Sequence, residues 1–261
     1  MCLIVFAYHH HPEYPLVLCA NRDEFYDRPT RSLHFWKDHP QVAGGRDLKK
    51  MGTWMGITRQ GRFAAITNYR EAGTQRSDAP SRGNLVTDYL TDHTSPRIYL
   101  NGLHGKSHQY NGFNLIIGDM EGLWYYTNRN GSGPVRLDPG IYGLSNRYLN
   151  TDWPKVRLVR SGLTALLKEG DKAIDRDNLL KLLQNQETAP DGQLPDTGVG
   201  VAWERMLAPV FITSPTYGTR CSSVLTIDCN GEVNFSETTW HPVKSRPTVI
   251  QKERVRFRIE N

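Results

Sequence analysis

A cysteine stands second in the chain, where removal of the initiator Met1 would place its thiol beside its own α-amino group. An α-amino group has a pKa of about 7.7, so Cys2 would carry both a nucleophile and a base. The N-terminus is therefore compatible with N-terminal-nucleophile catalysis. A cysteine that is simply buried in the first strand is the commoner outcome, and both interpretations stay open here.

An arginine follows at a spacing that a hairpin would bring opposite Cys2. The apolar runs at residues 2–8 and 16–21 flank a loop centred on Pro12. Symmetric pairing about that proline sets Cys2 against Arg22, with Cβ atoms about 5 Å apart. A guanidinium at that distance would stabilise a thiolate or bind an anionic group. A slip of one residue would turn Arg22 to the other face, so the assignment depends on the register.

Three more β-hairpins are predicted from pairs of β-rich runs joined at short turns. The last of them turns at Asn230-Gly231, a strong signal for a two-residue hairpin turn. The three pairs are residues 52–58 with 62–68, 114–119 with 123–127, and 224–228 with 233–238.

Helices are predicted where apolar residues recur at intervals of three and four. Residues 153–169 show this period, and Gly170 stands where a helix cap would fall. Asp175 can cap a shorter helix that runs to Leu183. Antiparallel hairpins with helices between them indicate the α+β class, with helices covering the sheets. Further short elements are helices at 82–90 and 96–103 and a loop at 187–200.

The overall composition indicates a folded globular protein. Apolar residues make up 38% of the 261 residues and charged residues 23%, which is ordinary for that class. No shift in composition marks a linker, so we expect one domain spanning residues 1–261. No apolar run approaches the roughly 18 residues needed to cross a bilayer, so no membrane span is expected.

The cysteines indicate where in the cell the protein is expected, and the net charge indicates which class of ligand it favours. Four cysteines without C-x-x-C spacing favour a reduced, cytoplasmic protein, with Cys19 in the core and Cys221 and Cys229 structural or incidental. The formal charge of +5 favours an anionic ligand. Basic residues concentrate at 46–50 and 252–258, and in the second stretch they alternate with apolar residues as on a strand. No nucleic-acid motif accompanies them, so a solvated basic surface is the simpler interpretation and no nucleic-acid partner is expected.

The second run closes on Asn21-Arg22-Asp23-Glu24, which on pattern alone is a solvated strand end. Within residues 18–29, however, it is similar to the signature of the NRDE family, the transport-and-Golgi-organisation proteins. The chain is identified as a member of that family by blocks in family order from residue 2 to about residue 240. The further blocks are Gly52-Thr53-Trp54-Met55-Gly56, Thr67-Asn68-Tyr69, Arg82-Gly83, Tyr110-Asn111-Gly112-Phe113-Asn114, Tyr142-Gly143-Leu144-Ser145-Asn146 and Tyr217-Gly218-Thr219-Arg220.

This resemblance implies a four-layer αββα sandwich of two mainly antiparallel sheets, as in the N-terminal-nucleophile hydrolases. It also implies a comparison with the cysteine amidases of the penicillin V acylase and bile salt hydrolase group. Those enzymes carry a second-position cysteine, an arginine on the second strand, an aspartate after it, a mid-chain asparagine and a late arginine. The residues here that resemble this set are Cys2, Arg22, Asn146 and Arg220.

The chain departs from the amidase pattern at the carboxylate. In the amidases the aspartate follows the arginine by three residues, and Phe25 stands there in this chain. Asp23 or Glu24 would have to replace it from a different position on the strand. In the hydrolase hypothesis Cys2 attacks an amide carbonyl. The other roles are oxyanion donation by Asn146 and Asn68 and substrate orientation by Arg22 and Arg220.

The resemblance also implies a second hypothesis, that of a carrier. Members of the family have been linked to haem trafficking and to acyl-CoA binding, and both ligands join an apolar body to anionic groups. Cys2 and the histidines at 9–11 could ligate haem iron, although a histidine run in a hairpin loop is more often a solvated turn. Neither a folding cofactor nor a metal centre is expected. A non-catalytic scaffold is the third hypothesis. The candidate ligand-binding residues are Arg22, Glu24, Arg28, Asn68, Asn146 and Arg220.

Overall fold

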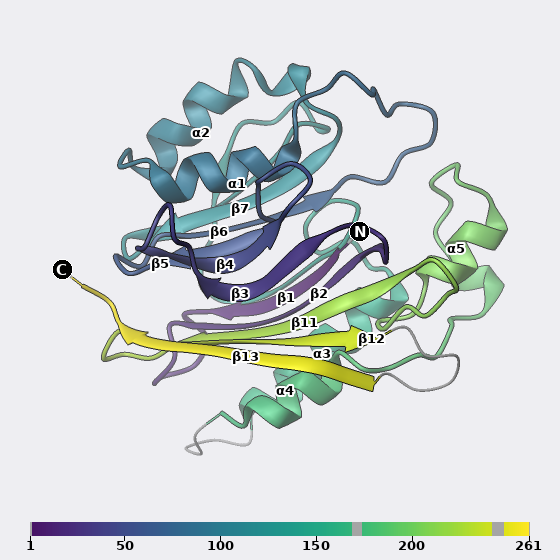
Figure 1. Ribbon diagram of the computed structural model, residues 1–261. Helices are drawn as coiled ribbons and strands as arrows, with labels where there is room; N and C mark the ends of the chain where they lie inside the picture. The colour runs from purple at the N-terminus through teal and green to yellow at the C-terminus, as the bar shows by residue number, and fades with distance from the viewer. Residues whose placement is uncertain (1, 169–173, 242–247, 261) are drawn as a thin grey trace.

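Two β-sheets stack face to face between two layers of helices (Figure 1). The structure is a computed structural model that describes residues 2–168, 174–241 and 248–260. One sheet has six strands in the order β10-β1-β2-β11-β12-β13, and every neighbouring pair is antiparallel. Its strands are β1 (Cys2–Tyr8), β2 (Leu16–Phe25), β10 (Gly140–Leu144), β11 (Tyr217–Ile227), β12 (Glu232–His241) and β13 (Thr248–Arg258).

The other sheet has seven strands, which pair antiparallel in sequence order from β3 to β9. This simple meander follows from the short turns that join consecutive strands. Its strands are β3 (Thr30–Phe35), β4 (Val42–Asp47), β5 (Met55–Thr58), β6 (Phe63–Asn68), β7 (Phe113–Asp119), β8 (Gly122–Thr127) and β9 (Val135–Arg136).

Three apolar clusters hold the four layers together. One fills the space between the sheets, and a second joins the seven-stranded sheet to α1 and α2. A third joins the six-stranded sheet to α3 and α4. The predicted αββα order is therefore confirmed. No helix in the described ranges has the length and apolar character to cross a membrane. The helices are α1 (Arg82–Thr91), α2 (Pro96–His104), α3 (Pro154–Lys168), α4 (Arg176–Leu182) and α5 (Val201–Leu207).

The first hairpin has the predicted register, in which Cys2 lies opposite Arg22 and Tyr8 opposite Leu16. Side chains alternate between the two faces of a strand. On β1, Ile4 belongs to the inter-sheet cluster and Val5 to the cluster under α3. Both faces of β1 are covered, which explains why its sequence is an unbroken apolar run.

The other predicted elements are confirmed with shifted ends. All three further hairpins form, and β2 continues past the predicted end at residue 21 to Phe25. Asp175 caps α4 by accepting the Asp177 N–H at 2.8 Å. The predicted end of the long helix at Glu169 and its cap at Gly170 lie outside the described residues. The predicted loop at 187–200 contains one short 3₁₀ turn, and α5 after it was not predicted.

Candidate functional site

The polar end of the first hairpin lies on the face of the sheet that looks toward the other sheet. Leu18 and Ala20 of β2 belong to the inter-sheet core, so by alternation Arg22 points to the same side. Arg22 pairs with Cys2 on one side and with Cys221 of β11 on the other. The three residues therefore form one row across three strands. Their exposed fractions are only 7%, 9% and 7%.

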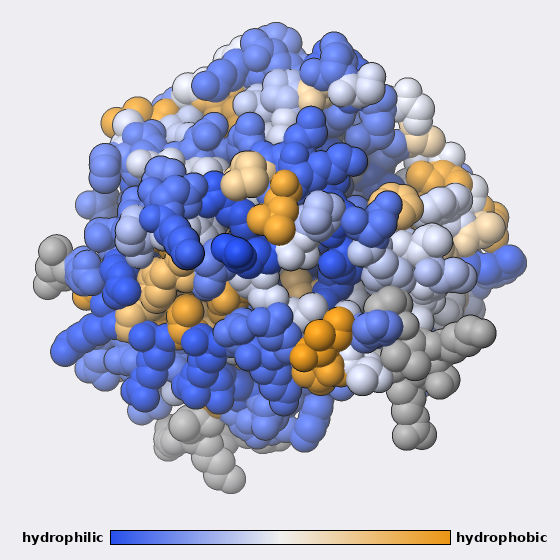
Figure 2. Space-filling model, in the orientation of Figure 1, coloured by the Kyte–Doolittle hydropathy of each residue, from blue (hydrophilic) through white to orange (hydrophobic). Residues whose placement is uncertain are grey.

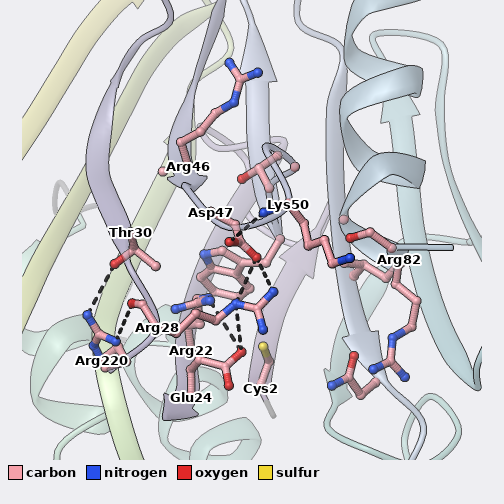
Figure 3. A pocket seen from close by; sticks show the side chains of 18 of the residues that line it. Cys2, Arg22, Glu24, Arg28, Thr30, Arg46, Asp47, Lys50, Arg82 and Arg220 are labelled. Atoms are coloured by element: carbon pink, nitrogen blue, oxygen red, sulfur yellow. Dashed lines mark hydrogen bonds and ion pairs between the residues drawn. The ribbon is translucent and has the colours of Figure 1, made fainter. Parts of the chain in front are cut away.

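Glu24 shares this face and is paired with two arginines. Its Oε2 lies 3.5 Å from Arg22 Nη2 and 3.7 Å from Arg28 Nε. The Arg28 Nε in turn donates to Asp47 Oδ2 at 2.9 Å. Figure 3 shows these side chains together with the Cys2 sulfur, with Arg220 and Thr30 on one side of the group and Arg82 on the other.

Asp23 borders the same cavity, but its carboxylate is engaged on the opposite face of β2. Its Oδ1 accepts the Thr219 hydroxyl at 2.7 Å, and Asp23 itself is 1% exposed. Burial raises the pKa of Asp23, and the charge of buried Lys155 acts in the other direction. Of the two carboxylates considered from the sequence, Glu24 is the one that meets the arginines.

A cleft of about 550 Å³ opens above this row between the ends of the two sheets. The seven-stranded sheet contributes Trp54 and Asn68, and the loop before α1 contributes Pro80. Arg82, at the start of α1, donates to the Gly112 carbonyl at 2.9 Å. Burial lowers the pKa of Arg82 to about 10, so it stays a cation at neutral pH.

Cations outnumber anions around the cleft. The described residues that line it include eight Arg or Lys side chains and four Asp or Glu side chains. Besides Arg22, Arg28, Arg82 and Arg220, the cations are Arg31, Arg46, Lys50 and Arg76. The anions are Asp23, Glu24, Asp47 and Glu237. A cavity with this imbalance attracts anionic molecules.

Arg220 holds the edge of the cleft together. It occupies a β-bulge, since β11 shifts register between Thr219 and Cys221. A bulge re-aims one side chain. Here the Arg220 Nη1 donates to the carbonyls of Phe25, Tyr26 and Arg28 at 2.8, 3.1 and 3.0 Å. These bonds close the turn after β2, so Arg220 shapes the wall that carries Arg28.

Asn146 and Asn68 are adjacent, but they occupy different positions relative to the cleft. The buried Asn146 amide donates to the Asn68 carbonyl at 2.8 Å, and Asn68 lines the cleft. The neighbouring Ser145 hydroxyl donates to the Cys2 carbonyl at 3.0 Å. Ser145 thus holds the backbone of Cys2, and the amide nitrogen of Asn146 is engaged with the backbone of Asn68 rather than directed at the cavity.

The thiols on the cleft floor are protonated at neutral pH. Burial raises the pKa of Cys2 from an ordinary 9.0 to about 11, although the Arg22 charge opposes the rise. Burial also raises the pKa of Cys221 well above its usual range. The thiolate is the nucleophilic form of cysteine, so neither thiol is activated in this state. Whether Met1 is removed was left open by the sequence, and Met1 lies outside the described ranges.

The family model for Transport and Golgi organisation 2 matches residues 1–242. A Transport and Golgi organization protein 2 homolog of Homo sapiens is 38% identical over 257 residues, covering 91% of this chain and 92% of the human protein. The chain belongs to this family. A Bos taurus homolog is 35% identical over 280 residues and covers all of both chains. The Transport and Golgi organization protein 2 of Drosophila melanogaster is 29% identical over 265 residues, 92% of each chain.

Two solved structures resemble this family member at low scores. A Caenorhabditis elegans ortholog of N-acylethanolamine-hydrolyzing acid amidase overlays with a TM-score of 0.45 at 11% identity, covering 86% of this chain and 92% of that one. A C2A mutant of conjugated bile acid hydrolase from Clostridium perfringens gives 0.43 at 10% identity, covering 100% and 97%. The chemistry of this chain has to be argued from its own residues.

Several residues that line the cleft of this family member were not predicted from its sequence. Cys221, expected to be structural or incidental, lies on the cleft floor, and Glu237 lies beside it. Alternation along β11 from Leu225 would have indicated the inward position of Cys221. The histidines at 9–11 follow the far end of β1 and do not line the cleft. In the described ranges, no group of three or more metal-binding side chains is placed to hold an ion.

Proposed function

We propose that this family member binds and carries a small amphipathic anion, of the kind represented by haem and by acyl-CoA. The excess of cations around the cleft is the observation that supports this proposal. A volume of about 550 Å³ also falls within the range of small-molecule sites. Arginine forks pair with carboxylates and phosphates alike, so the cleft suits either class of head group.

Apolar side chains at the mouth of the cleft suit the other half of such a ligand. Phe25 lines the cleft and is 47% exposed. Trp54, Ile66 and Pro80 add further apolar groups to the lining of the cleft. Figure 2 shows a mostly hydrophilic face on which a few apolar groups stand out. An anionic head among the arginines would leave an apolar tail near these side chains.

The ligand class is tested by titration with haemin, followed by the Soret band, and with palmitoyl-CoA, followed by the total tryptophan fluorescence, to which Trp54 at the cleft contributes. Arg22→Gln should weaken binding of the preferred ligand by about tenfold to a hundredfold, since bonds to charged groups contribute about 1.5–3 kcal/mol. The matched control is Arg157→Gln, which removes an exposed arginine that does not line the cleft.

The same titrations distinguish haem from acyl-CoA as the preferred ligand. Haem carries two carboxylates, and the cleft offers Cys2 and Cys221 but no histidine among its described lining residues. An acyl-CoA carries several phosphates and should show the steeper dependence on salt. Binding of neither ligand, or equal binding by wild type and Arg22→Gln, would reject the carrier and favour the scaffold hypothesis.

A Cys2-dependent amide hydrolase is the second candidate, because Cys2 lies on the cleft floor beside Arg22. The engaged amide of Asn146 weighs against it, and the raised pKa of the Cys2 thiol applies to the chain that retains Met1. The test compares wild type, Cys2→Ala and Cys2→Ser for hydrolysis of a fatty-acid amide. Cleavage that both variants lose, with ligand binding retained, would establish the hydrolase. Equal background rates in all three proteins would reject it.

A further inference from the structure

The last strand of the six-stranded sheet carries a ladder of cations that the cleft does not use. Val255 and Phe257 of β13 pack against the inter-sheet core, so the alternate side chains point to the outer face of the sheet. Six positions of β13 point outward and all are exposed; the first two are Thr248 and Ile250, and the last four are cations that we name the cation ladder: Lys252, Arg254, Arg256 and Arg258. The strand lies beyond the stretch that the family model matches.

No layer of the described structure covers this ladder. The helices of the outer layer pack on β1, β10 and β11, and β13 lies at the open side of the sheet (Figure 1). In the described ranges β13 pairs with β12 along one edge and with no strand along the other. The backbone N–H and C=O groups on that second edge are therefore available to another strand.

The charge on the ladder is largely uncompensated. Arg256 Nε pairs with Glu232 Oε1 at 2.5 Å. Among the described residues, Glu232 is the one carboxylate that forms an ion pair with the ladder. Arg254 donates to the Asn234 side chain at 2.7 Å and Arg258 to the Asn230 carbonyl at 3.0 Å. Exposed contacts of this kind contribute little free energy, so they exchange readily for better partners.

We propose that the free edge of β13 binds an extended, acidic segment of a partner protein as an added strand. Alternate residues of a strand lie roughly 7 Å apart, so glutamates or aspartates at every second position of the added strand would meet the ladder one to one. Main-chain hydrogen bonds to the edge would supply affinity, and the cross-strand charge pairs would supply specificity.

The chemistry of the strand selects this partner over the other candidates. Two copies of β13 paired edge to edge would oppose like charges, which disfavours self-association. Nonspecific binding of single-stranded nucleic acid relies on aromatic platforms for the bases. Phe257, the aromatic residue of β13, points into the inter-sheet core instead.

The test is fluorescence anisotropy with a labelled ten-residue peptide that alternates glutamate and valine. The full chain should bind it saturably at 150 mM salt. Neutralising the ladder in the variant K252Q/R254Q/R256Q/R258Q should weaken binding at least about tenfold, because four cross-strand charge pairs are lost. The matched control neutralises four exposed cations on other elements: Arg97, Arg157, Lys168 and Arg205.

A second peptide separates strand pairing from simple charge attraction. A glutamate–valine peptide that is N-methylated at every residue keeps the charge but has none of the N–H groups that a strand donates, and this peptide should bind at least about tenfold more weakly. Equal binding of the two peptides, or equal loss in the ladder and control variants, would overturn the proposal. So would more effective displacement of the peptide by a ten-residue oligothymidylate than by unlabelled peptide. The ladder variant leaves the eight cations of the cleft in place, so a peptide that bound the cleft instead would be retained by this variant and would count against the proposal without bearing on the carrier function.

Discussion

Two groups of charged residues lie on opposite faces of β2 and differ in access to solvent. The cleft cluster, on the face toward the other sheet, consists of Arg22, Glu24, Arg28 and Asp47, and borders an open cavity with further cations. The sealed cluster, on the face toward α3 and α5, holds two anions and two cations that are each at most 5% exposed. Its members are Asp23, Arg70, Lys155 and Glu204.

A sealed environment and an open one tolerate different balances of charge. Removing a charge from water costs several kcal/mol unless an opposite charge and hydrogen bonds compensate it. The sealed cluster has equal numbers of both signs, and Glu204 also accepts the Thr197 N–H and hydroxyl, although Nε and Nη2 of Arg70 are buried without a hydrogen-bond partner among the described residues. The cleft cluster borders a cavity open to ions and ligands, so an excess of one sign can persist there. We infer that the sealed cluster supports the fold and the cleft cluster binds.

The largest effect is expected from Glu204→Gln in the sealed cluster. The substitution leaves Arg70 buried beside a neutral partner, where the ion pair was 2.5 Å long with both side chains 4% exposed. Breaking such a pair from one side typically costs about 3–5 kcal/mol of unfolding free energy. Urea denaturation followed by tryptophan fluorescence measures the loss.

The control for this prediction is Asp191→Asn, which neutralises the exposed pair with Arg205. Its urea midpoint should match that of the wild type, because fully exposed pairs are screened by water and salt. A sealed-cluster variant that unfolded at the wild-type midpoint would contradict the structural role. It would also remove the contrast between the two faces of β2.

The second effect concerns the pH dependence of thiol reactivity on the cleft floor. With the pKa of Cys2 raised from 9.0 to about 11, its thiolate is about a hundredfold scarcer at pH 8 than in an ordinary thiol. Alkylation of Cys2 by iodoacetamide should therefore keep accelerating up to about pH 11. Cys229 is exposed and serves as the internal comparison in peptide mapping.

The raised pKa of Cys2 also determines the direction in which the free energy of unfolding changes with pH. Between pH 9 and 11 the unfolded chain loses the Cys2 proton while the folded chain keeps it. The unfolded state then binds fewer protons, so the contribution of Cys2 to stability falls as the pH rises through this window. A labelling rate for Cys2 that levels off by pH 8 would instead indicate an activated thiol and revive the hydrolase hypothesis.

The part of the cleft floor formed by Cys2 and Arg22 could be predicted from sequence because it depends on local pairing. A hairpin centred on Pro12 fixes the register, and alternation then places Cys2 and Arg22 on one face. The same alternation separates Arg22 and Glu24 from Asp23. Alternation does not tell which of the two faces is the inner one, because that depends on how the second sheet packs.

The walls of the cleft could not be predicted because they come from distant segments. Asp47 ends β4, and Arg82 begins α1, so their approach to Arg28 and Cys2 depends on how the sheets stack. The bulge at Arg220 adds one residue to β11, and no periodicity in the sequence marks it. The sealed cluster was hidden for a similar reason, since Lys155 and Glu204 resemble solvated helix residues until tertiary packing buries them.

The smallest predicted effect has the opposite sign to the others and returns to the cleft cluster. Glu24→Gln removes the carboxylate that lies 3.5 Å from Arg22 and 3.7 Å from Arg28, and so raises the positive charge at the cavity. A unit charge about 8 Å from a ligand at intermediate dielectric is worth about 1 kcal/mol, so anion affinity should rise about threefold to fivefold. Calorimetric titration with palmitoyl-CoA at two salt concentrations measures this, with Asp152→Asn as a control because Asp152 does not line the cleft.

A fall in affinity would mean that Glu24 serves chiefly to hold the two guanidinium groups in position. In that case the cleft cluster would resemble the sealed one, in which each charge depends on its partner.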